Sequence, residues 1–291
     1  RRLFEERKAP YLIALNKCDL LETLPEPGEH ELYVSAARGD GIHELKEAIA
    51  AVVRQPKNER KIVGDLLQPN DIVLLVTPID SAAPKGRLIL PQQQTIRDIL
   101  DHDAVSMVVQ VPQIQTALAA LGRKPRLVIT DSQAFGQVSR AVPEDVELTS
   151  FSILFARYKG QLEQMVRGAA ALDHLKDGDT VLISEGCTHH RQCEDIGTVK
   201  LPAWINGYTR KQNLQFRFTS GGEFPENFDG IALAVHCGGC MLNEREMQSR
   251  VERAAVAGVP MTNYGVAIAQ MHGILRRSLS PFPELAKLLN V

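Results

Sequence analysis

Five residues that can bind soft metals stand at the two ends of one segment of the chain. Cys187 and His189 open the segment as Cys-x-His. After 46 intervening residues, His236, Cys237 and Cys240 close it as His-Cys-x-x-Cys. Thiolate and imidazole are ligands for zinc, copper and iron–sulfur clusters, and a single tight turn lets a Cys-x-x-Cys pair direct both sulfurs at one centre. The pattern therefore predicts a metal or cluster site.

Each half of this motif is expected to follow a β-strand. Residues 181–184 and residues 231–235 are short apolar runs that lead towards Cys187 and into His236, respectively. In an open parallel α/β sheet, ligands gather beyond the carboxyl ends of the strands. If these two strands lie side by side, the three sulfurs converge on one site.

The second half of the motif leads into a predicted helix. Asn243 can cap that helix, and Glu246 stands at the capping-box position. Cys240 is then close to a helix N-terminus, whose partial positive charge favours an anion. Gly238 and Gly239 allow the backbone to approach a cluster closely and to donate N–H groups to it.

Other interpretations of these ligands remain open. A structural zinc site with three Cys and one His is chemically sound, and Cys237 with Cys240 could form a redox dithiol, although that leaves Cys187 unexplained. Three thiolates and one weaker ligand would give an exchangeable position on the metal. His236 and His189 are the candidates for that fourth ligand.

Composition restricts the class of protein. A chain of 291 residues with 44% hydrophobic residues is long enough for two domains and part of a third. The net charge of −2 gives no support for nucleic acid or an anionic membrane as a partner. No apolar run approaches a membrane span or a signal peptide, and the five cysteines, an odd number, favour reduced thiols, so a cytoplasmic location is expected.

The N-terminal region resembles the guanine-reading part of a GTPase. The apolar run 9–15 ends at Asn-Lys-Cys-Asp, in which the Asp carboxylate would accept hydrogen bonds from guanine, the Asn would hold the loop and the Lys stem would lie along the base. A second strand at residues 33–34 leads into Ser-Ala-Ala, which resembles the second guanine-contacting loop, and an amphipathic helix follows. The candidate guanine-contacting residues are Asn16, Lys17, Asp19, Ser35 and Ala36.

The phosphate-binding loop of a GTPase, Gly-x-x-x-x-Gly-Lys-Ser/Thr, does not occur in the sequence. The chain also starts without Met, in what reads as the middle of a helix. We therefore interpret residues 1–55 as the C-terminal end of a G domain, and we expect no GTP hydrolysis by the chain as written.

The central region is predicted to be a parallel α/β domain. After a polar linker at residues 55–61, strand-like runs alternate with helical patterns, as parallel sheets require. No catalytic constellation is found in this region, which favours an assembly or docking role. The predicted strands are residues 71–77, 105–111, 126–130 and 149–155, and the predicted helices are residues 92–100, 113–121 and 160–175.

Taken together, these motifs resemble the HydF family of FeFe-hydrogenase maturation proteins. Cys-x-His, the 46-residue gap and His-Cys-x-x-Cys occur here with a GTPase end, and the segments 77–91 and 184–200 agree with the family. The resemblance implies an α/β multidomain fold with parallel sheets flanked by helices and a partial G domain. It implies a GTPase end at residues 1–55, a dimerisation domain at 62–155 and a domain binding a 4Fe-4S cluster at 156–291.

The same resemblance implies a scaffold and carrier role. The protein would be a homodimer that receives the di-iron precursor of the hydrogenase cofactor from two radical-SAM maturases and passes it to apo-hydrogenase. The full-length protein would bind GTP. The alternative is a GTP-regulated interaction protein with a structural zinc site.

Overall fold

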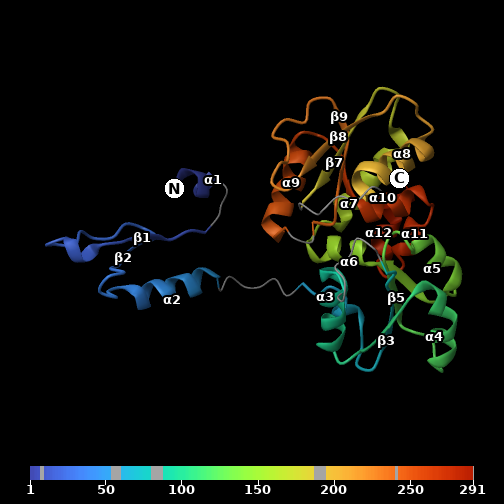
Figure 1. Ribbon diagram of the computed structural model, residues 1–291, viewed down its shortest axis with the longest axis horizontal. Helices are drawn as coiled ribbons and strands as arrows, with labels where there is room; N and C mark the ends of the chain where they lie inside the picture. Colours follow the sequence, from blue (N-terminus) through green and yellow to red (C-terminus); the bar gives the residue numbers. More distant parts are fainter. Residues whose placement is uncertain (7–9, 54–59, 80–87, 187–194, 240–241, 291) are drawn as a thin grey trace. The chain divides into compact units, whose positions relative to one another are not determined.

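The computed structural model describes residues 1–6, 10–53, 60–79, 88–186, 195–239 and 242–290, and the described residues form two compact units, Arg1–Arg60 and Lys61–Val291. Every β-strand pair in the described residues is parallel, and helices flank the sheets (Figure 1). The predicted α/β class is therefore confirmed.

The first unit contains one pair of parallel strands. Strand β1 (Ile13–Leu15) pairs with β2 (Glu31–Tyr33), so that Ile13 lies opposite Glu31. The predicted amphipathic helix is α2 (Ile42–Val53). The other elements of this unit are α1 (Arg2–Glu6) and the short 3-10 helix η1 (Cys18–Leu20).

The second unit begins with a sheet of four strands in the order β4-β3-β5-β6. The two central strands, β3 and β5, are nearly continuous apolar runs and are buried along most of their length, as expected for parallel strands that are covered on both faces. The strands are β3 (Ile72–Val76), β4 (Val105–Val109), β5 (Leu127–Thr130) and β6 (Glu147–Ser150). The 3-10 helix η2 (Gly64–Leu66) precedes the first strand, and the helices that connect the strands are α3 (Leu90–Leu100), η3 (Val111–Gln113), α4 (Ile114–Ala120) and α5 (Phe135–Ala141).

The predicted strand at residues 149–155 is wrong beyond Ser150. Strand β6 ends there, and helix α6 (Phe151–Tyr158) begins at the next residue. The Ser150 hydroxyl accepts a hydrogen bond from the Ile153 N–H at 3.3 Å, which is the geometry of a helix N-cap. Helix α6 is apolar on most sides because it is buried, and its sequence therefore lacks the periodicity that distinguishes a helix from a buried strand.

A second sheet of four strands, in the order β10-β9-β7-β8, completes the unit. The strands are β7 (Thr180–Glu185), β8 (Gln215–Ser220), β9 (Ile231–His236) and β10 (Met261–Asn263). The helices are α7 (Leu162–Ala169), η4 (Ala170–His174), η5 (Ile196–Lys200), α8 (Leu201–Thr209), α9 (Glu244–Val256), α10 (Tyr264–Met271), α11 (Leu275–Ser278), α12 (Pro283–Ala286) and η6 (Lys287–Asn290).

The two sheets of the second unit share one hydrophobic core. A single buried cluster contains Val73 and Leu75 of β3 together with Leu182 of β7 and Ala234 of β9. Helices α6 and α7 lie between the two sheets (Figure 1). Helix α7 packs closely against β10, because a Cβ atom on Gly168 would lie 2.0 Å from a backbone oxygen of β10.

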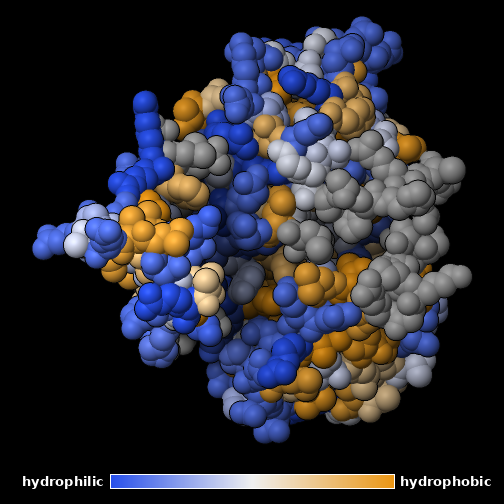
Figure 2. Space-filling model, turned by 60° about the vertical axis from the view of Figure 1, so that its left-hand side comes forward, coloured by the Kyte–Doolittle hydropathy of each residue, from blue (hydrophilic) through white to orange (hydrophobic). Residues whose placement is uncertain are grey.

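The two edges of the first sheet differ. At the β6 edge, the Ser280 hydroxyl accepts a hydrogen bond from the Leu148 N–H at 2.9 Å, and the Arg277 guanidinium donates to nearby carbonyls. At the β4 edge, Val105 and Val108 are 49% and 42% exposed. Figure 2 shows hydrophobic side chains at the surface in the lower part of the view, at the height of this sheet in Figure 1. Within the described residues, no helix is both long and apolar enough to cross a lipid bilayer.

Candidate metal centre

The two strands that lead into the metal motif are neighbours, as the sequence predicts. Strands β7 and β9 pair in parallel, with Ser184 opposite His236, and the Cys237 N–H donates to the Ser184 carbonyl at 2.8 Å. Both strands therefore end at the same edge of the sheet, where Gly186 and Cys237 follow them. The other predicted ligands, Cys187, His189 and Cys240, lie outside the described residues, so the convergence of the three sulfurs stays a prediction.

The sulfur of Cys237 is held by backbone N–H groups. The Gly186 N–H donates to Cys237 Sγ at 3.0 Å, and the Gly239 N–H donates to it at 3.4 Å. Hydrogen bonds of this kind favour a thiolate over a thiol and also stabilise cluster-bound sulfur. Gly239 has a φ of +57°, and a Cβ atom there would lie 2.6 Å from the sulfur of Met247, so both the backbone conformation and the space favour glycine at this position.

Both ring nitrogens of His236 have partners within the protein. Nε2 lies 3.0 Å from the Arg250 guanidinium, which can only donate, so Nε2 is the acceptor. Nδ1 therefore carries the proton and donates to the Cys237 carbonyl at 2.6 Å. His236 is fully buried and would have to break one of these two hydrogen bonds to bind a metal. His236 as the fourth ligand stays a prediction that this geometry disfavours.

Arg250 is a buried cation that contacts His236. It was not predicted from the sequence. Its side chain is 0% exposed, and its guanidinium also donates to Glu246 Oε1 and to the Gly221 carbonyl, each at 2.8 Å. The guanidinium carbon lies 5.1 Å from the centre of the Phe224 ring. The sequence did contain a signal, because Arg250 lies on the inward face of α9, where every other residue is apolar or small.

The predicted cap of α9 is confirmed. The Asn243 side chain accepts a hydrogen bond from the Glu246 N–H at 2.8 Å. The Glu246 carboxylate pairs with Arg250, one turn further along the helix. The first turn of α9 is therefore tied to the same buried network as His236.

Tyr264, the first residue of α10, lies close to the end of β7. Its hydroxyl is 3.5 Å from Glu185 Oε1, at the end of β7. Burial raises the pKa of Tyr264 above its ordinary value, and the negative charges of Glu185 and Cys237 raise it further. Tyr264 is therefore a neutral hydroxyl beside the motif.

The described part of the donor set fits a thiolate-bound group. Cys237 offers a sulfur with two N–H donors. Among the described residues, no group of three or more His, Cys, Asp or Glu side chains could hold a metal ion. A complete ligand set therefore depends on the cysteines that lie beyond those residues.

Comparison with protein families identifies the second unit. A family model described as the hydrogen maturase F dimerization domain matches residues 62–160, and one described as the hydrogen maturase F tetramerization domain matches residues 163–281. The chain belongs to the hydrogen maturase F family. The comparison with curated proteins finds no match.

Each of the two hydrogen maturase F matches covers one of the two sheets of the second unit. The dimerization match contains β3 to β6, and the tetramerization match contains β7 to β10 with His236 and Cys237. Both matched domains are named for self-association. The chain is therefore a self-associating protein of hydrogenase maturation.

The N-terminal unit of this hydrogen maturase F chain lies outside both matches, but its two predicted guanine loops are joined. The Asn16 side chain accepts hydrogen bonds from the Lys17 N–H at 2.8 Å and from the Ala36 N–H at 3.1 Å. Ser35 is buried, and its hydroxyl accepts from the Arg38 N–H at 3.2 Å. Asp19 lies in the 3-10 helix η1. One loop follows β1 and the other follows β2 in chain order, so the five predicted residues belong to one edge of this small sheet.

Proposed function

We propose that this hydrogen maturase F chain binds a 4Fe-4S cluster through Cys187, Cys237 and Cys240. With it, the chain acts as the scaffold and carrier that passes a di-iron precursor to apo FeFe-hydrogenase. The observation that carries this proposal is the position of Cys237. It follows one of two adjacent parallel strands, and its sulfur accepts two backbone N–H bonds, from the end of the other strand and from its own loop.

The chemistry of the ligands supports a carrier role. Three thiolates and a weaker fourth donor would leave one iron position open to exchange, which a closed site with four cysteines would not do. His189 and His236 are the proposed fourth donors. Of the two, His236 is the less available, since both of its nitrogens already have partners.

The N-terminal unit is proposed to be the end of a G domain that reads guanine. Asn16 supports this proposal because its side chain joins the loop that contains Asp19 to the loop that contains Ala36. GTP binding is assigned to the full-length protein, because the sequence has no phosphate-binding loop. Two radical-SAM maturases are the proposed sources of the precursor, and a homodimer is the proposed assembly.

Anaerobic reconstitution with iron and sulfide tests cluster binding. The wild-type chain should take up four iron atoms per site and absorb at about 400 nm. Cys237→Ser should lose this absorbance, whereas Cys18→Ser, which changes a buried cysteine in the other unit, should keep it. Stoichiometric zinc in place of iron, with no colour after reconstitution, would favour the structural zinc site.

The carrier role has its own assay. Protein loaded with the precursor should activate apo-hydrogenase, and Cys237→Ser should abolish the activation. Activation that persists in Cys237→Ser would show that the cargo is carried elsewhere.

A further inference from the structure

A buried lysine supports the loop that follows Cys237. Lys159 caps the C-terminal end of α6, is 6% exposed, and lies far from this loop in the sequence. Its ammonium group donates to the Gly238 carbonyl at 3.3 Å and to the Gly239 carbonyl. Removing an ammonium from water is costly, and the hydrogen bonds to these two carbonyls offset part of that cost. These bonds fix the two residues between the predicted ligands Cys237 and Cys240.

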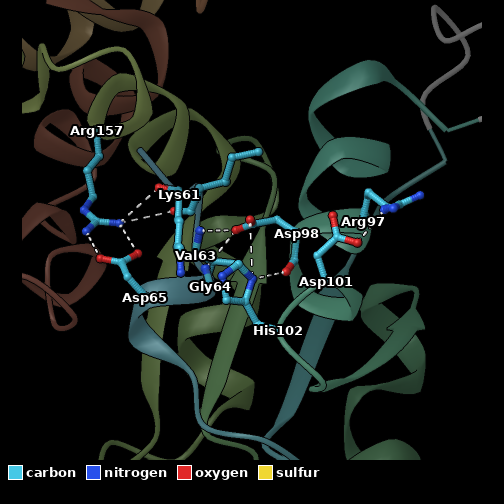
Figure 3. Close-up of polar contacts among 10 residues, drawn as sticks. Lys61, Val63, Gly64, Asp65, Arg97, Asp98, Asp101, His102 and Arg157 are labelled. Atoms are coloured by element: carbon cyan, nitrogen blue, oxygen red, sulfur yellow. Dashed lines mark hydrogen bonds and ion pairs between the residues drawn. The ribbon is translucent and has the colours of Figure 1, made fainter. Parts of the chain in front are cut away.

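Two residues before Lys159, Arg157 holds a different part of the chain. Its guanidinium donates to Asp65 Oδ1 at 3.0 Å, to Asp65 Oδ2, and to the carbonyls of Ile62 and Lys61 at 3.4 and 3.5 Å (Figure 3). Burial by itself would raise the pKa of Asp65, but the hydrogen bonds and charge of Arg157 outweigh it and hold that pKa below its ordinary value. We call residues 61–66, which follow the predicted linker, the leading segment.

The leading segment is also anchored to α3. Asp98 Oδ2 accepts hydrogen bonds from the Val63 and Gly64 N–H groups at 2.7 and 2.8 Å (Figure 3). His102 Nδ1 lies 2.7 Å from the Asp98 carbonyl, and its ring lies so close to Gly64 that a Cβ atom there would be 2.1 Å away. The leading segment therefore has one fixed position against α3 and α6.

Helix α6 is a stiff connection between these two contacts. Four of its large side chains are buried, and it packs against α3, α7 and α10. Close packing makes such a helix move as one body. A displacement at Arg157 is therefore transmitted to Lys159, which lies within one turn of it.

We propose that Lys159 is the positioning residue of the loop Cys237–Gly238–Gly239, and that α6, through Arg157 and Lys159, ties this loop to the leading segment. The tie joins the matched dimerization domain, which contains Lys159, to the matched tetramerization domain, which contains the loop. The position of the loop Cys237–Gly238–Gly239 therefore depends on the position of the leading segment, which follows the predicted linker. The effect of this tie on a bound cluster rests on the proposed function. The mechanical coupling of the loop to the leading segment does not depend on that function.

Hydrogen exchange of the cluster-free protein tests the mechanical part. Lys159→Met keeps the length of the side chain and removes the donors, and it should speed exchange in a peptide covering residues 236–242 by about tenfold. Lys159→Arg should restore part of the protection. Lys176→Met, the same change at an exposed lysine of the same compact unit, should alter nothing.

Arg157→Met tests the coupling. It should speed exchange in the leading segment and, to a smaller degree, in residues 236–242. Unchanged exchange of residues 236–242 in Lys159→Met would overturn the positioning role. Faster exchange confined to the leading segment in Arg157→Met would overturn the tie. Circular dichroism establishes that each variant is folded. If Lys159→Met does not fold, the comparison of Lys159→Arg with wild type provides the test.

A redox titration of the reconstituted protein tests the effect on the cluster. Loss of a buried cation beside a cluster disfavours its reduced, more negative state, so Lys159→Met should shift the midpoint potential to a more negative value, and Lys176→Met should not. An equal potential in wild type and Lys159→Met would overturn this role. Failure of the wild type to take up iron would instead refute the proposed function and leave the exchange result to decide the tie.

Discussion

Replacement of Arg250 by methionine should destabilise the second unit by about 2–4 kcal/mol. Methionine replaces the apolar stem of the arginine side chain and keeps its packing, so the change removes mainly the guanidinium. That group donates to His236 Nε2, to the Gly221 carbonyl and to Glu246, and it lies over the Phe224 ring. The variant therefore removes all four of these contacts at once.

The size of the effect follows from what remains after the change. His236 is fully buried, and leaving its Nε2 without a donor costs about 1–3 kcal/mol. The lost bond to the Gly221 carbonyl adds about 0.5–1.5 kcal/mol. Glu246 is 40% exposed, so water can replace its partner and its ion pair contributes less than about 1 kcal/mol.

Equilibrium urea unfolding, followed by circular dichroism, measures this loss. Arg253→Met is the matched control, because Arg253 lies on the same helix and its guanidinium carbon is 4.9 Å from the centre of the same Phe224 ring. No hydrogen bond joins Arg253 to His236, so its replacement should cost less than about 1 kcal/mol. Equal losses in the two variants, with unchanged m-values, would refute the idea that Arg250 holds the motif through His236.

Three further predictions follow from the packing, the open sheet edge and the lowered pKa. Gly168→Ala should destabilise the unit by about 1–3 kcal/mol in urea unfolding, because the new methyl group would collide with a backbone oxygen of β10, which cannot move aside. Gly136 has open space around it, so Gly136→Ala should be neutral or stabilising by up to about 1 kcal/mol. A larger loss of stability in Gly136→Ala than in Gly168→Ala would contradict the packing. Val108→Lys should weaken self-association in sedimentation equilibrium if the β4 edge is used, and an unchanged association constant would exclude that edge. The pKa of Asp65 is lowered in the folded state, so its ion pair with Arg157 stabilises the protein above the unfolded pKa of about 3.9, and this stabilisation is lost as the pH falls through the folded pKa. Below about pH 4, the free energy of unfolding of the wild type should therefore fall more steeply with pH than that of Asp65→Asn. Parallel curves of unfolding free energy against pH would contradict the ion pair.

The sequence predicted the strands and the cap around the motif well. Strands β7 and β9 each contain a short apolar run, and Asn243 is a residue type whose short side chain caps a helix. These are local signals, which depend only on neighbouring residues. The sequence also predicted that both strands end at one edge, because parallel strands of a sheet share the direction of their carboxyl ends.

Local signals failed where burial removed them. Residues 151–155 read as a strand because α6 is apolar on most sides, and only the neighbouring helices that cover it explain that pattern. The short strand β10 was not predicted, since its three residues give no periodicity and its identity as a strand rests on pairing with β9.

By itself, the sequence determined the chemistry that this protein can offer, since the spacing of its cysteines and histidines and the order of its domains are properties of the chain. Only the tertiary structure decided what surrounds that chemistry. Lys159 and Arg250 come from parts of the chain far apart in the sequence, yet the fold brings Lys159 to the Gly238 carbonyl and Arg250 to His236. The fold likewise determines that both nitrogens of His236 are engaged, because a hydrogen bond in a fully buried site depends on which groups the fold places within reach.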